Sequence, residues 1–378
     1  MKVVVIGAGV TGLGIGWKLA EAGAAVMVLE RAQVGSGASA VSCGMIETTA
    51  FAAGSPGDEL ATRAIAAWPA FKAALEKQSR IDIGFHRNGL LLARMKGEAA
   101  GEAAGEVLAG GKARQLEPLL GEGVGGAVLL PDAADVDCQA LIRALAVALV
   151  RAGGAVRSNE AAVRLEWDGS RVTGVATPFA VHHADAFVLA TGAWASRIEG
   201  LPKSTLPPIA PVKGEAVVLV PPPGARMPER PIWGNEICVV PRRGRLLVGA
   251  TGEAAGFDTT LSQAAVRWLY RQSTAMMPSL IEWHMAEHWA GLRAIAPDGL
   301  PVLGMVVPGL YVASGQYRAG IQFAPAVIED LSRLILERTA APPAFDPRRF
   351  GNGGPGVPVA ETPHKDVSGE ADVWRTGS

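Results

Sequence analysis

Two arginines far along the chain have the chemistry to bind a carboxylate. Arg293 follows a Trp-Ala-Gly-Leu run, and Arg318 lies in a loop before a predicted amphipathic helix that extends to about Glu337. A guanidinium pairs with a carboxylate through two parallel hydrogen bonds, which an ammonium cannot do. A cation is unfavourable at a helix N-terminus, so Arg318 indicates that an anion binds nearby. The alternative for each arginine is an ordinary surface salt bridge.

Other catalytic patterns in the sequence are weaker. The segment 284–288, His-Met-Ala-Glu-His, matches H-x-x-E-H, which can bind zinc when it lies on a helix. It runs into Trp-Ala-Gly and is better interpreted as a strand, in which the two histidines stand ~13 Å apart. Gly37-Ala38-Ser39 lacks the second glycine of a nucleophile elbow. We therefore predict no metal site and no hydrolase.

A glycine motif near the N-terminus is expected to hold a nucleotide. Gly7, Gly9 and Gly12 match G-x-G-x-x-G between an apolar run at residues 3–6 and a helix predicted over residues 10–22. Such glycines allow a tight turn, backbone approach to a pyrophosphate and close packing of helix on strand. The helix N-terminus supplies N–H donors and partial positive charge, which favour a phosphate.

A second strand, predicted over residues 25–29, ends at Glu30. This acid lies roughly 20 residues past the glycines, where a carboxylate can accept hydrogen bonds from a ribose. The whole pattern predicts a dinucleotide site, and the alternative is a glycine-rich turn in an ordinary α/β domain. The motif alone does not distinguish NAD from FAD.

A small-residue loop after Glu30 makes the prediction more specific. Gly35, Ala38, Ser39, Gly44 and Met45 match G-x-x-A-S-x-x-x-x-G-M. This pattern resembles the D-amino acid oxidase family of flavoproteins, within which it is most similar to the glycine oxidases. In that family the loop runs from the FAD diphosphate to the flavin ring. A nicotinamide dehydrogenase needs no such loop.

Two later motifs strengthen the resemblance. Residues 288–301 and 309–321 resemble the second and third signatures of the family, and the three motifs occur in the expected order. The resemblance places Arg293 on the substrate carboxylate. It also implies that N–H groups around residues 318–321 stabilise negative charge on the flavin.

The resemblance implies non-covalent FAD, with the three glycines on the diphosphate and Glu30 on the adenosine ribose. Cys43 is the alternative point for a covalent flavin link. A strand predicted over residues 186–190 runs into Gly192, where the chain returns to the nucleotide. The expected cofactor-binding residues are Gly7, Gly9, Val10, Thr11, Gly12, Glu30, Arg31, Ala38, Ser39, Cys43, Gly44, Met45, Gly192, Gln316, Tyr317, Arg318, Ala319, Gly320 and Ile321.

The implied reaction is oxidation of a small amino acid, glycine being one example. Hydride moves from the α carbon to flavin N5, the imine is hydrolysed, and O2 becomes peroxide. The amine must be neutral, but positioning replaces a dedicated base. The alternatives are a quinone-linked amino-acid dehydrogenase, a nicotinamide-dependent reductase and a non-catalytic nucleotide-binding regulator. The resemblance also suggests a role in thiamine biosynthesis.

The sequence departs from the family pattern at the substrate site. Cys238 stands where the resemblance leads us to expect a tyrosine, and Ala294 follows Arg293 in place of proline. The missing hydroxyl leaves the substrate preference open, with Tyr317 as a replacement to be tested.

Composition restricts the function classes. Net charge is −1 over 378 residues with interspersed charges, so neither nucleic-acid binding nor membrane insertion is expected. Three widely spaced cysteines favour a reduced cytoplasmic protein over a disulfide framework. A homo-oligomer is compatible with the sequence.

The predicted fold is α/β of the two-domain α+β kind, with a Rossmann-like FAD-binding domain interleaved with an antiparallel-sheet substrate domain. The first comprises residues 1–80, 131–205 and 288–350, the second residues 81–130 and 206–287, and residues 351–378 are expected to be a disordered tail.

Local patterns predict further elements. Helices are expected over residues 60–77, 138–152 and 263–277. Hairpins are expected at Asn88-Gly89 and at residues 167–169, and strands over residues 212–252. The Ala-, Gly- and Glu-rich run at residues 97–111 reads as a surface helix and loop.

Overall fold

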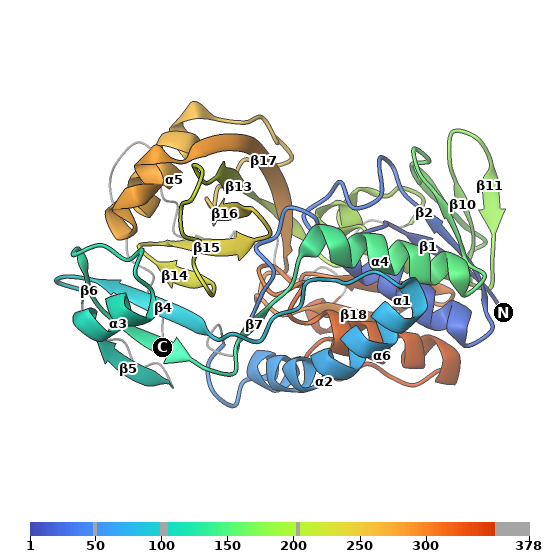
Figure 1. The fold of residues 1–378 in the computed structure, drawn as a ribbon. Coiled ribbons are helices and arrows are strands. Elements are labelled where there is room, and N and C mark those ends of the chain that lie inside the picture. Colours follow the sequence, from blue (N-terminus) through green and yellow to red (C-terminus); the bar gives the residue numbers. More distant parts are fainter. Residues whose placement is uncertain (48–50, 99–104, 202–204, 352–378) are drawn as a thin grey trace.

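The computed structural model describes residues 1–47, 51–98, 105–201 and 205–351. Two large sheets organise these residues (Figure 1). The predicted tail lies outside the described residues, apart from its first residue. Among the described residues no helix is long and apolar enough to cross a membrane.

A six-stranded sheet contains the N-terminal motif. Its order is β18-β19-β12-β1-β2-β8, with every neighbouring pair parallel except β18 and β19. Its strands are β1 (Lys2–Ile6), β2 (Ala25–Leu29), β8 (Ala155–Arg157), β12 (Ala186–Leu189), β18 (Val302–Val307) and β19 (Leu310–Ser314).

Both faces of this sheet are buried, and alternate side chains of β1 lie in two different cores. Val3 and Val5 pack in one core with the helices, whereas Val4 and Ile6 pack in a second core with a three-stranded antiparallel sheet. This agrees with the continuous apolar run expected of a buried parallel strand. The helices are α1 (Val10–Glu21), α2 (Pro56–Ser79), α4 (Cys138–Arg151) and α6 (Ala324–Glu337), and the small sheet is β9 (Arg164–Trp167), β10 (Val172–Ala176) and β11 (Val181–His183).

An eight-stranded sheet forms the other half of the molecule, on the left in Figure 1. Its order is β17-β13-β16-β15-β14-β4-β6-β5, and α5 (Gln263–Met276) packs in the same hydrophobic core. The strands are β4 (Leu90–Met95), β5 (Glu106–Ala109), β6 (Val124–Leu130), β13 (Ala210–Val220), β14 (Ile232–Gly234), β15 (Ile237–Arg242), β16 (Arg245–Gly249) and β17 (His284–Ile295).

The remaining elements are short. They are β3 (Met45–Ile46) paired with β7 (Ala134–Asp135), α3 (Gly110–Leu116), and the 3-10 helices η1 (Gly192–Arg197), η2 (Pro278–Glu282) and η3 (Pro347–Phe350). The predicted domain boundary at residue 288 falls inside β17, which pairs with β13 along its whole length. The domain division therefore stays a prediction.

Several local predictions are confirmed. The helix expected over residues 138–152 is α4, and Asp137 caps it by accepting the N–H of Ala140 at 3.0 Å. The hairpin at residues 167–169 joins β9 to β10. The H-x-x-E-H segment lies on β17, so it is a strand as expected.

The prediction of a hairpin at Asn88-Gly89 is wrong. The N–H of Gly89 donates to the carbonyl of Ala133, and that of His86 donates to Asp135, so this stretch binds residues 133–135. β4 pairs with β6 and β14. The local turn sequence did not decide the structure here, because this stretch pairs with residues more than 40 positions away.

The reading of residues 97–111 as helix and loop is wrong in part. Glu106–Ala109 forms β5, which pairs with β6, and α3 begins only at Gly110. Tertiary pairing outweighs the low strand propensity of this run. Residues 99–104 lie outside the described part of the chain.

Candidate active site

The N-terminal motif brings the predicted nucleotide ligands together. Gly9 is the N-cap of α1, and the Ser39 hydroxyl accepts the N–H of Val10 at 3.1 Å. The Glu30 carboxylate accepts the N–H groups of Ala8 at 2.9 Å and of Ala32 at 3.0 Å. The loop after β2 is thus fixed against the helix N-terminus, where a phosphate binds most favourably.

Two of the glycines are needed for close backbone packing. Gly7 has a φ of +106°, and a Cβ atom there would overlap the carbonyl oxygen of Ala190. A Cβ atom on Gly12 would overlap the carbonyl oxygen of Gly7. The first glycine therefore lets β1 turn beside the end of β12, and the third lets α1 approach β1.

Two cavities meet in the centre of the molecule. One extends toward Glu30 and Arg31, and the other extends toward Arg293 and Arg318. They form one elongated site because both are lined by Gly9, Ala38, Ser39, Ala190, Gly192 and Leu292.

The nucleotide end of this site contains two residues that were not predicted, Trp194 and Arg197. The guanidinium of the predicted Arg31 lies 3.7 Å from the ring centroid of Trp194, and both residues line the cavity. Arg197 also lines it, with its guanidinium 4.2 Å from the ring centroid of Phe257. Trp194 is only two residues past the predicted Gly192, so the motif at the end of that strand could have indicated it.

Arg293 projects from β17 against a flat backbone surface. Its Nη1 donates to the carbonyl of Thr251 at 3.0 Å. A Cβ atom on Gly214 would lie 2.5–2.6 Å from the guanidinium atoms, so any larger residue would displace the guanidinium from this position. Glu215 in turn fixes Thr251, since its N–H donates to Thr251 Oγ1 at 2.9 Å and its carbonyl accepts the Thr251 N–H at 3.1 Å. Neither Gly214 nor Thr251 was predicted.

The two arginines lie close enough to affect one another. Burial, together with the positive charge of Arg318, lowers the pKa of Arg293 to about 10, while Tyr317 acts in the opposite direction. The Arg318 guanidinium lies 5.3 Å from the ring centroid of Tyr317. All three residues line the cavity. A carboxylate placed between the guanidinium groups would relieve their repulsion.

Arg318 lies in a turn before a helix, as the sequence predicted, but the helix begins six residues after it. α6 begins at Ala324, with Pro325 in its first turn, and Arg318 lies in the preceding turn. Proline fixes the backbone for a first helical turn, which explains the later start. A bond from the Phe323 N–H to the Ala319 carbonyl, 2.8 Å, links this turn to the helix.

Most of the other predicted residues line the elongated site. Gly12, Gly44 and Ala319 do not line either cavity. Gly44 has a φ of +73°, and a Cβ atom there would overlap the Val136 carbonyl. Among the described residues no group of three or more His, Cys, Asp or Glu side chains could hold a metal ion.

The wall opposite Arg293 is apolar. Cys43, Met45, Trp233, Cys238 and Ala250 line the cavity and pack in one hydrophobic cluster. Trp233 and Cys238 are directly paired between β14 and β15. No hydroxyl stands at the Cys238 position, as the sequence indicated.

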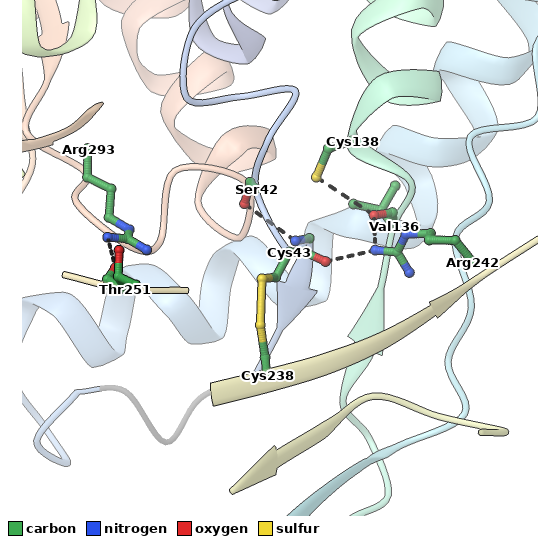
Figure 2. Close-up of a disulfide and its surroundings, with 9 residues drawn as sticks. Ser42, Cys43, Val136, Cys138, Cys238, Arg242, Thr251 and Arg293 are labelled. Carbon is green, nitrogen blue, oxygen red and sulfur yellow. Dashed lines mark hydrogen bonds between the residues drawn. A yellow bond between two sulfur atoms is a disulfide. The ribbon is translucent and has the colours of Figure 1, made fainter. Parts of the chain in front are cut away.

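The cysteine prediction is wrong for two of the three thiols. Cys43 and Cys238 are joined as a disulfide that links the loop after β2 to β15 (Figure 2). The two cysteines are 195 residues apart in the sequence, so their spacing did not indicate the pairing. Cys138 is free and buried, and its burial raises the thiol pKa to about 12.

The donor set fits FAD. A carboxylate at one end, the α1 N-terminus with Ser39 in the middle, and a wide part lined by Val41, Gly291 and Ala313 match the ribose, diphosphate and ring of that cofactor. Gly291 brings β17 close to the loop at Ala38 and Val41, since a Cβ atom there would lie 2.5 Å from Val41 Cγ2 and displace it.

Comparisons with known proteins agree with this arrangement. The family model described as FAD dependent oxidoreductase (DAO) matches residues 2–334. A glycine oxidase of Geobacillus kaustophilus is 33% identical over 342 residues, which cover 85% of this chain and 89% of the relative. A bifunctional protein ThiO/ThiG of Nostoc sp. is 31% identical over 90% of this chain and 53% of its own length.

A solved structure agrees with the fold. The crystal structure of the Geobacillus kaustophilus glycine oxidase matches with a TM-score of 0.82 and 32% identity, covering 92% of this chain and 97% of the other. The predicted fold class and FAD cofactor are confirmed by these matches. The chain therefore belongs to the FAD-dependent oxidoreductases of the DAO family.

Proposed function

We propose that this FAD-dependent enzyme oxidises glycine or another small amino acid and passes the electrons to O2, releasing peroxide. The observation that carries the proposal is the pair of guanidinium groups, Arg293 and Arg318, in a cavity continuous with the nucleotide site. Two cations facing one cavity are suited to a carboxylate, which is the group common to all amino acids.

Arg293 is held in place by its neighbours. Thr251 holds one of its nitrogens, and Gly214 supports the guanidinium plane from below. A substrate carboxylate would bind the remaining N–H groups, which fixes the α carbon relative to the cavity. Bound FAD supplies the chemistry, which is acceptance of a hydride from that carbon.

The cavity walls contain no general base. In the described chain, no Asp, Glu, His or Lys lines the cavity that contains Arg293. The substrate amine must therefore lose its proton to solvent before oxidation, and two nearby guanidinium groups favour that loss by repelling an ammonium. The protein contributes positioning, exclusion of water by the apolar wall, and charge.

We also propose that the protein is cytoplasmic and that it contributes to thiamine formation. The likeness to a protein called ThiO/ThiG supports the second. We propose that the flavin is held non-covalently and that Glu30, the glycine motif and Ser39 bind its adenosine and diphosphate parts.

Anaerobic titration of the yellow protein tests the proposal. Glycine, sarcosine, D-alanine and proline are added in turn, and bleaching of the flavin absorbance is recorded. At least one of them should bleach it, and air should restore the colour within seconds with formation of peroxide. Bleaching by none would contradict the proposed substrate class, whereas bleaching without recovery in air would indicate a quinone-linked dehydrogenase.

A further inference from the structure

Two cysteines from opposite halves of the molecule meet at the cavity that contains Arg293. Cys43 comes from the loop between β2 and β3, and Cys238 from β15 of the eight-stranded sheet. Both line the cavity, and their Cα atoms lie 7.2 Å apart. Figure 2 shows the two sulfur atoms joined between Arg293 and Arg242.

The position of Cys43 is fixed by neighbouring backbone contacts. Nη2 of Arg242 donates to the Cys43 carbonyl at 2.7 Å and to the Val136 carbonyl at 2.8 Å. Arg242 belongs to the same strand as Cys238. The loop is therefore held beside β15 by these hydrogen bonds as well as by the disulfide.

The third cysteine provides an internal contrast. Cys138 is 3% exposed, its Sγ lies 3.8 Å from the Val136 carbonyl, and burial raises its pKa to about 12. It does not line the cavity that contains Arg293. An oxidant in that cavity therefore reaches Cys43 and Cys238 and leaves Cys138 reduced.

We propose that Cys43 and Cys238 form a reversible oxidation site for hydrogen peroxide made in the same cavity, and that closing their disulfide limits the enzyme's own activity. The inference rests on the proposed oxidase function, which supplies the oxidant. Cys43 is the attacking thiol because it is partly exposed, whereas Cys238 is 1% exposed.

The reaction balances without another reagent. The Cys43 sulfur attacks one peroxide oxygen, the O–O bond breaks, and a sulfenic acid and one water form. The Cys238 sulfur then displaces hydroxide from the Cys43 sulfur, and the second water leaves with the remaining thiol proton. Two thiols are oxidised by two electrons and one peroxide is reduced to two waters; a dithiol reductant reverses the change.

Closing the bond changes the cavity. Two sulfur atoms in contact are separated by about 3.5–4 Å, whereas a disulfide holds them about 2 Å apart. The bond therefore draws the loop that contains Cys43 toward the eight-stranded sheet, near Arg293 and Arg318. We expect the oxidised enzyme to bind the amino acid more weakly and to release FAD more slowly, because the loop is covalently held.

Peptide mapping tests the chemistry. Fully reduced holoenzyme is treated with excess hydrogen peroxide, then alkylated and digested without reductant. The expected product is one cross-linked peptide pair containing Cys43 and Cys238, with Cys138 alkylated. The Cys138→Ala variant should form the same cross-link and Cys238→Ala should not. Absence of the cross-link in wild-type and Cys138→Ala protein would overturn the proposal.

Kinetics and flavin release test the consequence. After peroxide treatment the KM for the substrate should rise at least threefold and FAD release in mild urea should slow at least threefold, both reversed by dithiothreitol. Cys43→Ser, compared with its own untreated sample, should respond to neither reagent. Cys238→Ala can still form a sulfenic acid at Cys43 but no cross-link, so its FAD release should not slow. A cross-link that changes neither KM nor flavin release would overturn the regulatory role. Because peroxide is added from outside, cross-linking is measured even if amino-acid bleaching fails, so the two proposals fail separately.

Discussion

The nucleotide end and the substrate end of the elongated site are built in different ways. At the nucleotide end the chain uses backbone N–H groups, glycines and one carboxylate drawn mainly from residues 7–45. At the substrate end each important group comes from a different segment: Gly214, Thr251, Arg293 and Arg318 are spread over more than a hundred residues. The first end is a local structure, whereas the second exists only after the eight-stranded sheet has formed.

This difference predicts that the two ends can be damaged separately. A substitution at the nucleotide end should reduce flavin retention first, and one at the substrate end should raise KM while the protein stays yellow.

The largest effect is expected for Arg293→Ala. Two charge-assisted hydrogen bonds contribute about 1.5–3 kcal/mol each, so kcat/KM should fall roughly 10²–10⁴-fold. Arg293→Lys keeps the charge but loses the planar pair of donors, and it should recover only part of the loss. Steady-state oxygen consumption measures the rate, and the ratio of flavin to protein absorbance serves as the control. Loss of flavin with an unchanged KM would mean that Arg293 serves the cofactor.

Gly7→Ala should give the second largest effect, at the opposite end. The new methyl group would overlap the Ala190 carbonyl at a φ of +106°. Strain of about 1–3 kcal/mol, with the overlap added, should weaken FAD retention roughly ten- to a hundredfold. Equilibrium titration of the apoprotein with FAD measures this. Gly37→Ala is the matched control, because Gly37 lines the same cavity and a Cβ atom there has no neighbour within 4 Å.

Gly214→Ala tests whether the support beneath Arg293 matters. Its methyl group would lie 2.5–2.6 Å from the guanidinium, which must then shift away from Thr251. We expect KM to rise about tenfold, since a misplaced catalytic group loses part of its binding energy, while flavin retention stays unchanged. Gly252→Ala is the control, because a Cβ atom at Gly252 has open space around it. Equal KM values for the two variants would show that the close approach is not needed.

The sequence predicted the local end far better than the assembled one. The proximity of Gly7, Gly12 and Glu30 could be predicted because their spacing is set by one strand, turn and helix; their roles toward the cofactor stay proposals. The roles of Gly214 and Thr251 depend on pairing between β13, β17 and the segment after β16, and no local pattern reveals that pairing. Residue chemistry made Arg293 a candidate, and the family resemblance places it on the substrate carboxylate, a role that stays a proposal.

The same limit explains the errors. The pairing of Cys43 with Cys238 and the strand at Glu106–Ala109 both require partners distant in sequence. The apolar pattern of the last helix begins at Ile321, three residues before α6 starts at Ala324, because Pro325 marks its first turn. Hydrophobic periodicity locates a helix more reliably than its boundary.

The smallest predicted effect is a pH dependence confined to the substrate end. Arg293 is a cation below its lowered pKa of about 10 and loses its charge as the pH rises through that value. Carboxylate binding is therefore complete below pH 9 and should weaken roughly fourfold by about half a pH unit above the pKa. Amino acids also gain reactive neutral amine as the pH rises, so kcat/KM should rise first and fall only above pH 10.

Propionate has no amine, and its binding, followed by the flavin spectrum, should show the fall alone. Cofactor retention should change less over the same range, because Arg293 lines the part of the site away from Glu30 and Arg31. Constant propionate affinity up to pH 11 would mean that Arg293 keeps its charge, and the two ends would then differ in construction but not in their response to pH.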